Sequence, residues 1–210
     1  MNGASQGIWP ALFPEDDIPR VLQDVLDACK DLKRPGKSEQ RPEEAITKQV
    51  YEKLRQMPDY RRGPLEPHFE SWLPDLDSRA DIRFSCGKGI DTYFLVEAKR
   101  LFVTFPEGTR NSLVKAYVNQ GMMRFIEGRY APFQEASAML GYVHDESIAT
   151  AREALAKEIA IQAESLRLQF GLRPSMLRVS PPVEETCHAL NPPRSFTLYH
   201  LWVGIPRAQN

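Results

Sequence analysis

The chain has 210 residues, enough for one domain with a substantial core, and its apolar fraction of 42% is ordinary for a folded soluble protein. Its 27 Lys and Arg residues oppose 28 Asp and Glu residues, which leaves a net charge of −1. This balance excludes a strong overall positive field, so any binding of nucleic acid would need a local basic patch.

The three cysteines, Cys29, Cys86 and Cys187, are odd in number and widely spaced. They form neither a zinc signature nor a disulfide framework, so we expect a reducing, cytoplasmic location. The first ten residues lack the basic and apolar regions of a signal peptide. No apolar run approaches the ~18 residues of a membrane span, so no membrane partner is expected.

Residues 1–41 are expected to form an N-terminal extension with one helix, from Pro19 to about residue 32. Residues 42–210 are expected to form a single domain. A helix is predicted from Pro42 to about Met57, because apolar residues recur at helical spacing along it. A strand is weakly indicated over residues 66–73.

The central segment predicts a hairpin, with strands at residues 80–85 and 92–99 joined through Gly87, Lys88 and Gly89. After a β-prone run at 101–105, the chain favours a helix over 113–128 and a short strand over 138–143. A long amphipathic helix is predicted over 148–170, ended by Gly171, and a last strand over 196–203. This order predicts an α/β domain with a mixed sheet, since a hairpin at its centre argues against an all-parallel one.

Asp81 begins the first hairpin strand, and Glu97 and Lys99 end the second. Side chains alternate along a strand, so Glu97 and Lys99 share one face and Ala98 occupies the other. An acid at a strand start is usually a turn or capping group, and Glu97 with Lys99 could be a plain ion pair. However, two clustered carboxylates repel unless a cation compensates. A metal site explains all three residues together, as a metal-dependent phosphodiesterase would require.

Two further polar residues could join this set. Glu43 lies on the apolar side of the helix beginning at Pro42, which favours an inward carboxylate, although acids in a first turn often only complement the helix dipole. Gln120, on the helix over 113–128, would orient a water or a phosphate oxygen if it faced the sheet; otherwise it is an ordinary surface residue. Basic residues flank the proposed site in sequence and could supply a local positive patch: Arg61, Arg62, Arg100, Arg110, Lys115, Arg124 and Arg129.

The pattern formed by Glu43, Asp81, Glu97-Ala98-Lys99 and Gln120 resembles the PD-(D/E)xK phosphodiesterase superfamily. The resemblance covers residues 42–143 and implies a restriction-endonuclease-like αβββαβ core, with a mixed central sheet flanked by helices. Two positions depart from the family pattern: Ala80 precedes the Asp where proline is frequent, and Arg124 stands where the nuclease–helicase subset has a tyrosine.

The same resemblance implies the chemistry of the site. It implies Mg²⁺ or Mn²⁺ held by Asp81, Glu97 and the Ala98 carbonyl, helped by Glu43, with Lys99 stabilising the phosphate or positioning the attacking water. The implied activity is cleavage of nucleic acid, with DNA as the expected partner, in a repair or phage-defence system. A homodimer or a partner protein could supply targeting. The alternative is a catalytically inactive module on this fold that binds a protein or nucleic-acid partner.

The four histidines have no metal-ligand spacing on any one element. His200 lies in the apolar strand expected over 196–203. The sequence favours a satisfied core or edge histidine at this position.

Overall fold

The computed structural model describes residues 12–36, 39–73, 78–87, 92–105, 107–190 and 194–206. The hairpin turn predicted at Gly87, Lys88 and Gly89 therefore lies outside the described residues beyond Gly87. The elements follow in chain order: η1 (Glu15–Asp17), α1 (Ile18–Ala28), α2 (Pro42–Leu54), α3 (Pro58–Arg62), β1 (Leu65–Leu73), β2 (Ser78–Cys86), β3 (Tyr93–Leu101), β4 (Val103–Thr104), β5 (Arg110–Asn111), α4 (Val114–Tyr117), η3 (Val118–Met122), α5 (Met123–Ile126), β6 (Ala136–Val143), α6 (Ile148–Ile161), β7 (Leu168–Pro174), β8 (Glu184–Leu190) and β9 (Arg194–Gly204).

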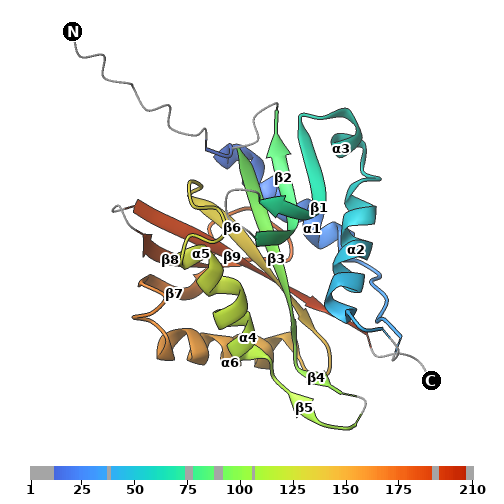
Figure 1. Cartoon of the computed structure of the whole chain (residues 1–210), viewed down its shortest axis with the longest axis vertical. Coiled ribbons are helices and arrows are strands. Elements are labelled where there is room, and N and C mark those ends of the chain that lie inside the picture. Colours follow the sequence, from blue (N-terminus) through green and yellow to red (C-terminus); the bar gives the residue numbers. More distant parts are fainter. Residues whose placement is uncertain are drawn as a thin grey trace.

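The protein is built around a mixed seven-stranded sheet in the order β1-β2-β3-β6-β9-β8-β7 (Figure 1). The three strands β1, β2 and β3 pair antiparallel, β3, β6 and β9 pair parallel, and β9, β8 and β7 pair antiparallel. The predicted α/β class with a mixed sheet is confirmed. The central strand β3 is buried along most of its length, which explains its continuous apolar run.

Helices cover both faces of the sheet (Figure 1). On one face α1 and α2 pack against residues such as Val96 and Leu140, and on the other α4, α5 and α6 pack against residues such as Leu95 and Met139. The segment expected as an N-terminal extension contributes α1 to this core, because Val21 is fully buried in it. Ser147 caps α6 by accepting a hydrogen bond from Thr150 N at 3.1 Å.

The predicted helix over 148–170 is wrong in its last part. The helix α6 ends at Ile161, and the chain re-enters the sheet as the edge strand β7, in which Gly171 lies instead of ending a helix. The apolar positions Leu166 and Phe170 continue a helical spacing, but pairing with β8 determines the conformation there. Tertiary pairing thus overrides the local periodicity.

The sequence pattern did not predict the strand β8, because three of its four buried positions are polar. Its buried residues are Glu184, Thr186, His188 and Leu190, and they alternate with partly exposed ones. Thr186 Oγ1 lies 2.8 Å from His188 Nε2 and 3.0 Å from His200 Nε2. His200 Nδ1 in turn lies 2.9 Å from Tyr117 Oη, so the prediction of a satisfied core histidine is confirmed.

Candidate active site

The adjacent strands β2 and β3 bring two carboxylates together. Their register pairs Ile82 with Val96, and Asp81 and Glu97 flank this pair at the same end. Asp81 Oδ2 accepts a hydrogen bond of 2.7 Å from Ala98 N. Ala98 packs into the core on the face of the sheet that α1 and α2 cover. Glu97 and Lys99 therefore point to the other face, as predicted from the alternation of side chains along a strand.

Glu97 is an acid buried at the end of an apolar strand. Only 2% of the residue is exposed, and its Oε2 atom is buried without a hydrogen-bond partner in the described part of the chain. Its Oε1 atom accepts a hydrogen bond of 2.6 Å from Lys99 Nζ. A buried carboxylate oxygen without a donor is costly, so this atom has an unused capacity to bind a cation.

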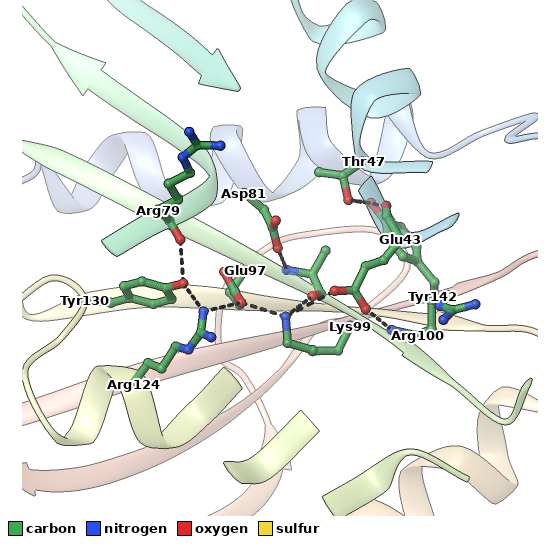
Figure 2. Close-up of polar contacts among 11 residues, drawn as sticks. Glu43, Thr47, Arg79, Asp81, Glu97, Lys99, Arg100, Arg124, Tyr130 and Tyr142 are labelled. Carbon is green, nitrogen blue, oxygen red and sulfur yellow. Dashed lines mark hydrogen bonds and ion pairs between the residues drawn. The ribbon is translucent and has the colours of Figure 1, made fainter. Parts of the chain in front are cut away.

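Lys99 is the cation at the centre of the site (Figure 2). Besides Glu97, its Nζ atom donates to Ala98 O at 2.7 Å and to Glu43 Oε1 at 3.3 Å. Burial acts to lower the pKa of Lys99, but the carboxylates of Glu97, Glu43 and Asp81 outweigh it and raise that pKa above its usual value. Lys99 therefore stays protonated and balances part of the negative charge.

Glu43 reaches the same site from the first turn of α2. Its Oε2 atom accepts a hydrogen bond of 2.8 Å from Arg100 N, and its Oε1 atom faces Lys99. The neighbouring Thr47 hydroxyl donates to Glu43 O at 2.9 Å and lies 3.1 Å from Tyr142 Oη, which fixes this turn against the sheet. Glu43 is thus at the site, with both carboxylate oxygens engaged by donors of β3.

Arg124 and Tyr130 complete the site from the other side, and no sequence pattern indicated Tyr130 (Figure 2). Arg124 Nη1 lies 3.6 Å from Glu97 Oε1 and donates to Tyr130 Oη at 2.5 Å. That hydroxyl donates to Arg79 O at 2.5 Å. Burial, together with the Glu97 charge, raises the pKa of Tyr130 to about 12, so it remains a donor at neutral pH.

One open, polar pocket of about 410 Å³ is lined by Glu43, Asp81, Glu97, Lys99 and Arg124. Gln120 lines it from the π-helical segment η3, where the residue is exposed. Of the seven basic residues expected to form a patch, Arg100 and Arg124 line the pocket, and Arg79 joins them from β2. Arg110 and Arg129 instead pair with acids, Glu146 and Glu127. The pocket thus has an acidic floor and a partly cationic rim.

The oxygen donors of the floor fit a hard divalent cation. Asp81 and Glu97 offer carboxylates and Ala98 a carbonyl, and Mg²⁺ is commonly held by one or two carboxylates with water and substrate oxygens completing its shell. Burial, and next the Glu97 charge, raises the pKa of Asp81 well above its usual value, because the charged form of a buried acid is disfavoured beside a second acid. No cluster of three or more His, Cys, Asp or Glu side chains suited to a metal occurs among the described residues.

Within the part of the chain that the structure describes, no helix has the length and apolarity to cross a membrane. No protein-family model, curated protein or solved structure matches this chain.

Proposed function

We propose that this protein is a metal-dependent phosphodiesterase that cleaves nucleic acid, with DNA as its substrate. One observation carries the proposal. Asp81 and Glu97 lie on adjacent strands next to Lys99, and one buried oxygen of Glu97 has no hydrogen-bond donor in the described chain. Apart from the short elements α3, β4 and β5, the succession α2, β1, β2, β3, α4 to α5 and β6 follows the αβββαβ order of the PD-(D/E)xK superfamily, which supports the same proposal.

In this proposal Asp81, Glu97 and the Ala98 carbonyl hold Mg²⁺ or Mn²⁺. When bound, the ion would polarise the phosphoryl group and acidify a water. Lys99 would place its ammonium beside the phosphate and stabilise the negative charge that develops on it. Glu43 would hold Lys99 in position through the 3.3 Å contact, and its second oxygen would stay on Arg100 N.

The cationic rim would bind the backbone of the substrate. Arg79, Arg100 and Arg124 line the pocket and carry guanidinium groups, which suit phosphate oxygens by charge and by planar geometry. Arg124 has 39% of its side chain exposed, so it can exchange its contact with Glu97 for one with a phosphate. The net charge of −1 makes this local patch the main electrostatic attraction for DNA.

The test is cleavage of linear and circular DNA with Mg²⁺ or Mn²⁺ by the wild-type protein and by Lys99→Ala. Arg173→Ala is the matched control, because Arg173 is also paired with an acid, Glu185, but lies on β7 outside the pocket. We expect metal-dependent cutting that Lys99→Ala loses and Arg173→Ala keeps. Unchanged DNA cleavage by Lys99→Ala would contradict the proposal.

A second candidate, an inactive module on this fold, is favoured by one observation. The Lys99 ammonium already donates to Glu97, Ala98 and Glu43, so the set also works as a closed structural ion pair. This candidate predicts no affinity for divalent ions, whereas the enzyme proposal predicts binding. Calorimetric titration with Mn²⁺ separates the two, and Glu97→Gln should abolish any binding that depends on the site.

A further inference from the structure

A second pocket, of about 540 Å³, shares a wall with the first. Arg100 lines both pockets, and on α2 the neighbours Pro42 and Glu43 line one each. The second pocket is bounded on its far side by Arg34 and Gly36, and by Phe105 and His144 from the segments that follow β4 and β6. The two pockets therefore adjoin at Arg100.

Two of the polar side chains that line this pocket, Arg34 and His144, carry a buried atom without a hydrogen-bond partner among the described residues. Arg34 Nη2 lies 2.8 Å from Asp145 Oδ1, but its Nε atom is buried without a hydrogen-bond partner among the described residues. His144 is only 8% exposed, and its Nε2 atom is likewise buried and without such a partner. An unpaired, buried polar atom of this kind is rare in a native structure unless a ligand or water completes it.

The charges of Arg34 and Arg100 both act on His144. Burial, and then the charges of Arg34 and Arg100, lower the pKa of His144 to about 4, with Asp145 opposing them. One acid, Glu39, also lines the pocket, but its Oε1 atom accepts a hydrogen bond from Arg41 N. The local field at His144 is thus positive, in a protein whose net charge is −1.

Part of the remaining wall is apolar. Pro35, Pro42, Val103 and Phe105 line the pocket beside the cationic groups. A cationic corner next to a proline and aromatic wall suits a nucleotide, whose phosphate binds guanidinium groups and whose base packs on apolar or aromatic surfaces. Inorganic anions would use only the cationic corner.

We infer that this pocket, defined by Arg34, Arg100 and His144, binds the nucleotide of the substrate strand next to the one whose phosphate is cleaved. The inference rests on the proposed function and extends it to a substrate-positioning site. A single sugar links consecutive phosphates of one strand, so a strand bound in the first pocket would carry its next nucleotide towards the second pocket, which shares Arg100 with it. Arg100 would contact the strand between them.

Gly36 offers a test by charge alone. A Cβ atom built on Gly36 meets nothing within 4 Å, and the residue needs no left-handed backbone. Gly36→Asp and Gly36→Asn should both fold, and they differ only by one negative charge at the rim of the pocket. The assay is fluorescence anisotropy with a labelled single-stranded DNA of about 12 nucleotides, in EDTA so that no cleavage occurs.

We expect Gly36→Asp to weaken binding by about fivefold and Gly36→Asn to leave it nearly unchanged, with the difference shrinking as salt increases. Equal affinities for the two variants, or no binding of this DNA by the wild-type protein, would overturn the inference. If dAMP binding depends on the charge at residue 36 but DNA binding does not, the pocket belongs to a free nucleotide and the assignment to the substrate strand is wrong.

The outcome for cleavage is read separately. If the two variants bind DNA with the expected difference but the protein never cuts it, the assignment of the pocket stands and the nuclease proposal is wrong. If the protein cuts DNA but the two variants bind it equally, the nuclease proposal stands and the assignment of the pocket is wrong.

Discussion

Acidification should destabilise this protein strongly, because several of its histidines are buried in neutral form. His200 is the clearest case: it is fully buried between Thr186 and Tyr117, and burial, then His188, lowers its pKa to about 3. Burial also lowers the pKa of His188 to about 4. The folded protein therefore resists protonation of these rings.

The sign and size of the effect follow from linkage. In the unfolded chain a histidine has a pKa of about 6.5, so between pH 6.5 and about 3 the unfolded state binds the extra proton. The stabilisation from a neutral, buried His200 is fully present above pH 6.5 and is lost progressively as the pH falls towards 3. Between pH 7 and pH 5 the loss is about 2 kcal/mol for this one residue, a large part of a typical folding free energy of about 5–15 kcal/mol.

The assay is urea denaturation at pH 7 and pH 5 for the wild-type protein and His200→Gln. Glutamine can still hydrogen-bond to Thr186 and Tyr117 but does not titrate. We expect the free energy of unfolding to fall by about 2 kcal/mol less in the variant than in the wild type over this interval. The same pH dependence in both proteins would refute the reasoning, whatever their absolute stabilities.

Three further predictions concern the site and a helix end. Asp81→Asn should remove most Mn²⁺ affinity in a calorimetric titration, since it takes away one of two carboxylates; unchanged affinity would contradict the assigned ligands. Arg124→Gln should slow single-turnover cleavage by about 100-fold, the effect of losing one charged donor at a phosphate, with Mn²⁺ affinity retained; an unchanged rate would place Arg124 outside catalysis. Ser147→Ala should lower the free energy of unfolding by about 1 kcal/mol in urea, because the α6 cap is lost, and no loss would show that the cap is dispensable.

The hairpin and its polar residues could be predicted because they depend on local rules. Strand alternation places Glu97 and Lys99 on one face, and an antiparallel hairpin brings Asp81 next to Glu97. The mixed sheet likewise follows from the order of helices and strands. Glu43 could be expected at the site from its place on α2, although its contacts with Arg100 N and Lys99 could not.

The rest depends on contacts between distant parts of the chain. Tyr130 enters the site only because the chain after α5 returns to β2, where its hydroxyl meets Arg79 O. The strand β8 has no apolar alternation, since three of its four buried side chains are polar: Glu184, Thr186 and His188. Glu184 is buried because Arg152 pairs with it and Trp202 Nε1 donates to it at 3.0 Å, contacts that no local pattern indicates.

The most direct test of the central claim is the rate of DNA cleavage by the wild-type protein and by Glu97→Gln over a range of Mg²⁺ concentrations. Glutamine keeps the size of the buried side chain and removes its charge, so the fold is retained while the proposed ligand is lost. We predict that the wild-type protein cuts DNA only with the metal and that Glu97→Gln is inactive at every concentration. Equal, metal-independent cutting by both proteins, or no cutting by the wild-type protein at any Mg²⁺ concentration, would contradict the account.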